Sequence, residues 1–142
     1  FALHVGETSW GTNTGVAPTT PQTNTSATNV YDALLLGAQR FGHALALPKF
    51  PVVMDQAMKN GVAVESCPLS NQMLQYVDDL RDHPAAVMMA AGVPVTISPD
   101  DPGPLGYDSV VYDWWSAYVA WDVDLASLKR MARNSIDHSF AS

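Results

Sequence analysis

The chain has 142 residues, of which 14 are acidic and 7 are Lys or Arg, giving a formal net charge of −7. A negative surface disfavours nucleic acids as partners because it repels their phosphates. No apolar run approaches the roughly 20 residues that a membrane-spanning helix needs, so we expect no membrane contact either. The single cysteine, Cys67, cannot form an internal disulfide, and we expect a small buried residue rather than a reactive thiol.

Four short apolar stretches each run into polar or ionisable side chains. We expect strands at residues 1–3, 40–43, 62–66 and 93–97. The carboxyl ends of parallel strands meet at one edge of a sheet or barrel, where α/β enzymes keep their chemistry. The sequence therefore predicts that six side chains from these strand ends gather at one rim: His4, Glu7, His43, Ser70, Asp100 and Asp101.

Helical patterns fill the segments between these strands, and Asn29, Ser70 and Asp124 are expected as N-caps. In the aromatic fifth helix, we expect Trp115 and Tyr118 to pack in the core rather than to cover a ligand pocket. The alternation of strands and helices predicts an α/β fold with about four βα units. The expected helices lie near residues 29–36, 47–60, 71–81, 85–91, 107–121 and 125–138.

Residues 11–28 are rich in Thr, Asn, Gly and Pro and lack a hydrophobic period. Such a composition predicts an exposed, flexible loop, which we interpret as an insertion between the first strand and the first helix. The triplet Asn24-Thr25-Ser26 fits the acceptor pattern for N-glycosylation. Asn24 is therefore a candidate glycosylation site if the protein is secreted.

Four motifs follow one another along the chain: His-Val-Gly-Glu-Thr from His4, Arg-Phe-Gly-His ending at His43, Glu-Ser-Cys-Pro-Leu-Ser-Asn-Gln-Met-Leu from Glu65, and Ile-Ser-Pro-Asp-Asp-Pro from Ile97. In this order they resemble the adenosine deaminase family, and most closely its secreted branch, the adenosine-deaminase-related growth factors. A βα unit takes about 30 residues and a complete (β/α)₈ barrel about 250. The resemblance implies that residues 1–142 are the C-terminal half of a metal-dependent-hydrolase (β/α)₈ TIM barrel, within the catalytic domain of a longer, extracellular protein.

The resemblance also implies a metal and two of its ligands. Zn²⁺ would be held by His4 and Asp100, and imidazole and carboxylate are donors that suit this ion. Zinc would activate a water molecule at neutral pH. The family's two other zinc ligands form a His-x-His motif, which does not occur in the 142 residues. We therefore expect this polypeptide alone to bind zinc weakly and to be inactive.

Catalytic and substrate-binding roles follow from the same resemblance. Glu7 would protonate N1 of the purine as C6 is attacked, which requires a carboxyl kept protonated by burial. His43 would stabilise or orient the attacking hydroxide, and Asp101 would share a hydrogen bond with N7. Ser70 would support these groups from behind. The family usually has Gly where Ala44 follows His43, and Ala adopts a positive φ only at a cost, so we expect the local backbone to differ.

Three functions remain open on the sequence. The first is zinc-dependent hydrolytic deamination of adenosine and 2′-deoxyadenosine to inosine-type products and ammonia, with a small-molecule purine nucleoside as partner. The second keeps the zinc site but acts on another aminopurine, adenine or AMP. The third is a non-catalytic growth factor or binding protein that retains the fold, because fold alone does not establish function. The resemblance also allows a homodimer of the full-length protein.

Overall fold

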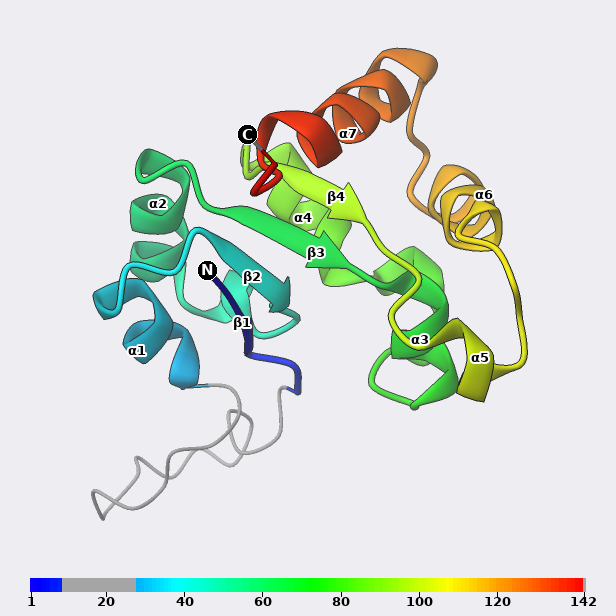
Figure 1. Cartoon of the computed structure of the whole chain (residues 1–142), viewed down its shortest axis with the longest axis horizontal. Helices are drawn as coiled ribbons and strands as arrows, with labels where there is room; N and C mark the ends of the chain where they lie inside the picture. Colours follow the sequence, from blue (N-terminus) through cyan, green and yellow to red (C-terminus); the bar gives the residue numbers. More distant parts are fainter. Residues whose placement is uncertain (9–27, 142) are drawn as a thin grey trace.

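The computed structural model describes residues 1–8 and 28–141, and it contains a sheet of four parallel strands (Figure 1). The strands are β1 (Ala2–Val5), β2 (Arg40–His43), β3 (Ala63–Ser66) and β4 (Val95–Ile97), and they pair in chain order. Because every neighbouring pair is parallel, all four carboxyl ends lie at the same edge. The expected α/β fold with four strand-and-helix units is confirmed in the described residues.

Helices follow each strand, and some of them pack against the sheet. Figure 1 shows α1 and α2 together on the β1 side, α7 alongside β4, and α3 and α5 beyond the tips of β3 and β4. The helices are α1 (Asn29–Leu35), η1 (Leu47–Lys49), α2 (Pro51–Lys59), α3 (Pro68–Met73), η2 (Leu80–Asp82), α4 (Pro84–Ala90), α5 (Pro102–Leu105), α6 (Val111–Ala120) and α7 (Leu125–Asp137).

The hydrophobic core lies between the sheet and these helices. Phe41, Val64 and Val95 contribute to it from three adjacent strands, and each is at most 1% exposed. They form one buried cluster with Val30 of α1 and Met88 of α4. Side chains alternate between the two faces of a strand, so the residues next to these three point to the opposite face.

That opposite face carries polar side chains. The register aligns His4 with Gly42, Gly42 with Glu65, and Glu65 with Thr96, so these four residues form one row across the sheet. The side chain of His4 is 66% exposed and that of Glu65 is 24% exposed. Arg40 forms an ion pair with Glu65, with 2.7 Å between Nε and Oε1. The face turned away from the core is therefore the one available to a polar ligand.

The expected helix over residues 71–81 is wrong. α3 begins at Pro68 and ends at Met73, and Gln75 then takes a left-handed φ of 60°. Proline suits the first turn of a helix because the amide hydrogen that it lacks has no partner there. The helix therefore starts earlier than predicted, and Ser70 lies inside it instead of capping it.

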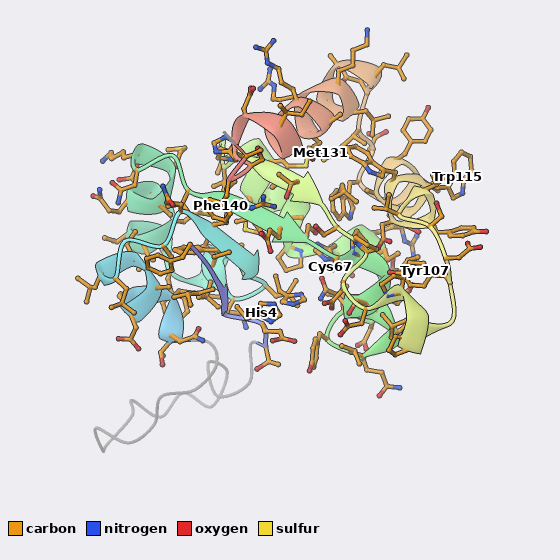
Figure 2. The ribbon with its side chains drawn as sticks, in the orientation of Figure 1. His4, Cys67, Tyr107, Trp115, Met131 and Phe140 are labelled. Atoms are coloured by element: carbon orange, nitrogen blue, oxygen red, sulfur yellow. The ribbon has the colours of Figure 1, made fainter. Side chains whose placement is uncertain are left out.

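The expected burial of Trp115 and Tyr118 is also wrong, since these residues are 64% and 41% exposed. Figure 2 shows Trp115 projecting outward from α6. The buried side of this segment instead consists of Asp113, Ala117 and Trp121, which lie one helical turn apart. The aromatic pattern misled the prediction because a polar residue, Asp113, occupies a core position of the helix.

Asn29 has a different role from the predicted N-cap. Thr28 takes the N-cap position, and Oδ1 of Asn29 accepts a hydrogen bond from the amide of Gly6 at 2.7 Å. The Asn29 side chain therefore ties the start of α1 to the turn that carries Glu7. Asp124, in contrast, caps α7 as predicted, because its side chain accepts a hydrogen bond from an amide of the first turn.

Two further expectations concern residues outside the described ranges. The flexible loop was expected at residues 11–28, of which only Thr28 is described, and the candidate glycosylation site Asn24 is not described either.

Among residues 1–8 and 28–141, no helix has the length and apolar character needed to span a membrane.

Truncation of Phe41 tests the assigned core. In the full-length protein, Phe41→Ala should lower the free energy of unfolding by about 3–5 kcal/mol, because the ring is fully buried and its loss leaves a cavity. Val52 lies on α2 and is 79% exposed, so Val52→Ala should change this free energy by no more than about 0.5 kcal/mol. Denaturant unfolding followed by circular dichroism measures both variants, and equal effects would contradict the core.

Candidate active site

Four of the predicted site residues meet at the carboxyl edge of the sheet. His4 lies in β1, Glu7 in the turn that follows, His43 at the end of β2, and Asp100 after β4. The imidazole rings of His4 and His43 stand edge to face, with their centroids 4.7 Å apart. Figure 2 shows His4 near the tip of β1, on the same edge as the other strand ends. The structure therefore brings together residues that are far apart in the sequence.

Glu7 lies between the two imidazoles. Its Oε2 atom is 3.7 Å from His4 Nδ1, and its Oε1 atom is 4.0 Å from His43 Nε2. His43 Nε2 is also 3.9 Å from Asp100 Oδ2, so His43 faces both carboxylates. His43 is 2% exposed, whereas the side chain of Glu7 is 31% exposed. The burial that the sequence analysis required of Glu7 is thus only partial in the described residues.

Two residues of the site adopt a backbone conformation that L-residues rarely take. The φ angle is 60° at His43 and 58° at Asp100. Each left-handed residue costs roughly 1–2 kcal/mol, and such strain is concentrated at functional sites. Ala44 has a φ of 51°. Its methyl group therefore does not prevent the left-handed conformation, and the backbone tolerates the strain that was expected to change it.

Ser70 and Asp101 flank Asp100 in different ways. The Ser70 hydroxyl donates a hydrogen bond to Asp100 Oδ2 at 2.6 Å, and Ser70 is fully buried. A short bond to a carboxylate holds its orientation, and the supporting role of Ser70 in the reaction stays a prediction. Asp101 is exposed at the N-cap position of α5, and its side chain makes no hydrogen bond to that helix. Its contact with a substrate stays a prediction.

Behind His43 lies a buried polar chain that sequence reasoning missed. Asn71 Nδ2 is 3.2 Å from His43 Nδ1, and Asn71 Oδ1 is 3.0 Å from His83 Nε2. His83 Nδ1 accepts a hydrogen bond from the amide of Ala85 at 3.1 Å, which makes His83 the N-cap of α4. The signal for His83 in the sequence is its place directly before Pro84, since proline suits the first turn of a helix. The only signal for Asn71 was its place in the third motif.

Asp113 is the second residue that the sequence analysis missed. It is fully buried on α6, and its Oδ1 atom accepts a hydrogen bond from the amide of Leu69 at 3.1 Å. Burial raises the pKa of this carboxyl, although the bond from Leu69 acts in the opposite direction. Leu69 directly precedes Ser70 and Asn71 in α3. The bond from α6 therefore holds the turn that carries both supporting residues.

Cys67 lies close to the site as a buried thiol. Its sulfur is within 4.8 Å of ligand atoms of His43 and Asp100. Burial, reinforced by the negative charge of Asp100, raises the pKa of the thiol far above its ordinary value. The thiol is therefore protonated when no metal ion is bound. Cys67 is 4% exposed, which confirms the prediction of a small buried residue.

The side chains at the rim are of the types that bind zinc. Ligand atoms of His4, Glu7 and His43 lie within 4.8 Å of one another, and Asp100 lies beside His43. Imidazole nitrogen and carboxylate oxygen are ordinary zinc donors. The predicted ligands, His4 and Asp100, have the right donor types for such a centre. They provide only two ligands, whereas a catalytic zinc normally takes three from the protein. The described residues therefore offer donor types that suit part of a metal centre.

A parallel sheet with imidazoles and carboxylates at its carboxyl edge is typical of α/β hydrolytic enzymes that use a metal. The comparison with protein families agrees with this class. The adenosine deaminase family model matches residues 21–142, which is most of the chain. The chain therefore belongs to the adenosine deaminase family, as its motifs predicted.

Curated relatives carry the same family name. Adenosine deaminase 2 of Dictyostelium discoideum is 49% identical over 112 residues, which are 79% of this chain and 21% of that protein. Adenosine deaminase 2 of Homo sapiens is 39% identical over 142 residues, which are 98% of this chain and 26% of that protein. The chain thus spans about a quarter of the length of these relatives.

Solved structures confirm the fold class. An adenine deaminase from Arthrobacter aurescens is 32% identical, with a TM-score of 0.75 over 82% of this chain and 36% of that chain. A zinc-bound amidohydrolase from Burkholderia ambifaria is 21% identical, with a TM-score of 0.69 over 82% of this chain and 33% of that chain. At this lower identity the likeness concerns the fold alone. Both place the sheet and its helices within part of a larger α/β barrel enzyme.

Gly42 offers a test of the position of His4. A Cβ atom at Gly42 would lie 2.8 Å from His4 Cδ2 across the paired strands. Gly42→Ala should therefore displace the imidazole and weaken Zn²⁺ binding to the full-length protein by about 10- to 100-fold. Gly103→Ala is the matched control, since a Cβ there meets no atom within 4 Å. Zinc titration by calorimetry compares the two, and unchanged affinity in Gly42→Ala would remove His4 from the metal site.

Proposed function

We propose that the full-length protein catalyses the hydrolytic deamination of adenosine and 2′-deoxyadenosine, forming inosine or 2′-deoxyinosine and ammonia. The observation that carries this proposal is that the Glu7 and Asp100 carboxylates lie within 4.0 Å of His43 Nε2, at the edge that also holds His4. Attack of water on a purine carbon requires a proton donor and a means of activating the water. The relatives named adenosine deaminase 2 support the choice of reaction.

We assign His4 and Asp100 as zinc ligands. When bound, zinc supplies activation of a water molecule at neutral pH. Their imidazole nitrogen and carboxylate oxygen are ordinary zinc donors, which supports the assignment. The remaining ligands would come from elsewhere in the full-length protein, because the 142 residues contain no His-x-His motif.

The other rim residues act on the substrate and on the water. Glu7 donates a proton to N1 of the purine while the oxygen of the water attacks C6. One proton of the water passes to the amino nitrogen, whose bond to C6 breaks as ammonia leaves, and the other proton restores the Glu7 carboxyl. His43 orients the water through Nε2, the nitrogen that faces Glu7 and Asp100. Asp101 shares a hydrogen bond with N7 of the purine. Ser70 holds Asp100 in place through its 2.6 Å hydrogen bond.

The relatives also bear on the location of the protein. Relatives of the adenosine deaminase 2 type and the resemblance to the growth-factor branch support a secreted, full-length protein that acts on a small purine nucleoside. We take residues 1–142 as part of its catalytic domain. A homodimer of the full-length protein stays a prediction.

Adenine is a second candidate substrate, because an adenine deaminase is 32% identical to this chain. Ultraviolet absorbance of the purified, zinc-loaded, full-length protein with adenosine, 2′-deoxyadenosine, adenine and AMP separates the possibilities. We expect turnover of the two nucleosides. Turnover of adenine or AMP alone would change the substrate, and no turnover of any of the four would favour the non-catalytic binding protein.

Replacement of Glu7 tests the proton donor. Glu7→Gln should lower kcat for adenosine by about 100-fold or more, because an amide cannot transfer the proton. Asp55→Asn makes the matched carboxyl-to-amide change on α2, where Asp55 is 52% exposed and pairs with Lys59, and should leave kcat unchanged. Steady-state rates of both variants provide the measurement. A near-normal rate for Glu7→Gln would remove this residue from the reaction.

A further inference from the structure

In the buried chain of hydrogen bonds behind His43, the donor and acceptor of each bond can be assigned, starting from a backbone amide. The amide of Ala85 can only donate, so the His83 Nδ1 atom that it contacts at 3.1 Å must be an unprotonated acceptor. A neutral imidazole carries its single proton on the other nitrogen. His83 therefore presents Nε2–H to Asn71 Oδ1, which lies 3.0 Å away and accepts.

His83 stays neutral at physiological pH. It is 1% exposed and its ring lies against that of Trp121, with the centroids 5.0 Å apart. Burial lowers the pKa of His83 to about 4, and the proximity of the His43 imidazole acts in the same direction. An imidazolium would carry a second proton on Nδ1 and lose the bond from Ala85. The donor and acceptor ends of His83 are thus fixed.

The same reasoning assigns the donor and the acceptor between Asn71 and His43. With its Oδ1 atom committed to His83, the amide presents Nδ2 to His43 Nδ1 at 3.2 Å. An amide nitrogen donates and cannot accept, so His43 Nδ1 must be the unprotonated nitrogen. The proton of neutral His43 is then on Nε2, which is 4.0 Å from Glu7 Oε1 and 3.9 Å from Asp100 Oδ2.

We propose that His83 and Asn71 are positioning residues that set the tautomer of His43, so that it presents Nε2–H to the reaction site as a hydrogen-bond donor. This inference rests on the role proposed above for His43 in orienting the attacking water. In this arrangement His43 donates a hydrogen bond to the water's oxygen rather than taking its proton. The hydrogen bond from Asn71 to His43 Nδ1 therefore sets this end of the ring.

Asn71→Asp is the most direct test, because it changes one amide nitrogen to oxygen at nearly constant shape. The new carboxylate can only accept, so it should draw the proton of His43 to Nδ1. Histidine-selective ¹⁵N labelling of the full-length protein, with the His43 signals assigned by comparison with a His43→Gln sample, reports which nitrogen is protonated. We expect protonated Nε2 in the unmodified protein and protonated Nδ1 in Asn71→Asp, with kcat for adenosine lower by about 100-fold and KM changed far less.

Two substitutions of His83 separate positioning from helix capping. The Gln amide nitrogen falls near the place of His Nε2, so His83→Gln keeps a donor to Asn71 but loses the cap of α4. The Asn side chain reaches only the place of Nδ1, so His83→Asn keeps the cap but loses that donor. We expect His83→Gln to retain the His43 tautomer and most of kcat, and His83→Asn to lose about 10- to 100-fold in kcat.

The outcomes distinguish this inference from the proposed function. Protonated Nδ1 in the unmodified protein, an unchanged tautomer in Asn71→Asp, or normal kcat in His83→Asn with loss in His83→Gln would each overturn the positioning role. The nitrogen signals are read without turnover. If the unmodified protein deaminates nothing, the proposed function fails, while the tautomer comparison still decides whether Asn71 and His83 set the state of His43.

Discussion

The in-register parallel pairing of β1 to β4 is the constraint on which the site depends. It places four carboxyl ends at one edge, so His4, His43 and Asp100 come close although they are distant in sequence. The core side chains fill the other face of the sheet and leave this edge to polar groups. Left-handed backbone at His43 and Asp100 turns the chain sharply at two of the ends. Packing of the sheet against the hydrophobic core offsets the free-energy cost of these left-handed residues.

The rear of the site is a set of buried polar groups that satisfy one another. Ser70, Asn71 and His83 are each at most 1% exposed, and each makes a hydrogen bond toward the site or toward the next member. An unpaired polar group at such depth costs about 1–3 kcal/mol, so few other arrangements of these side chains are stable. Asp113 secures the short helix α3 on which two of them stand. The first turn of α3 therefore contributes hydrogen bonds to site residues through Ser70 and Asn71.

The described residues also form an open structure. β1 and β4 are the outer strands of the sheet within these residues, and His4 is 66% exposed on the face turned away from the core. Closure of a sheet into a barrel pairs such edges and covers that face. The partial donor set at the rim and the partial cover of Glu7 are consistent with a site that is completed by other parts of a longer protein, since the chain spans about a quarter of its curated relatives.

The sequence by itself determined the alternating strands and helices, the Asp124 cap of α7, and the family, because each of these is a local pattern of apolar spacing, turn residues or motif letters. It also determined which polar side chains stand at the strand ends. The parallel order that brings His4, His43 and Asp100 to one edge then follows from the fold class that those patterns predict.

Only the tertiary structure decided what lies behind that edge. The bond from Asn71 to His43, the contact of Asn71 with His83 and the link from Asp113 to α3 join segments that have no shared local pattern. The same holds for the exposure of Trp115, which depends on Asp113 occupying the core side of α6. Hydrogen bonding between buried polar groups is fixed by the three-dimensional distance between donors and acceptors, and sequence spacing carries no measure of that distance across a folded chain.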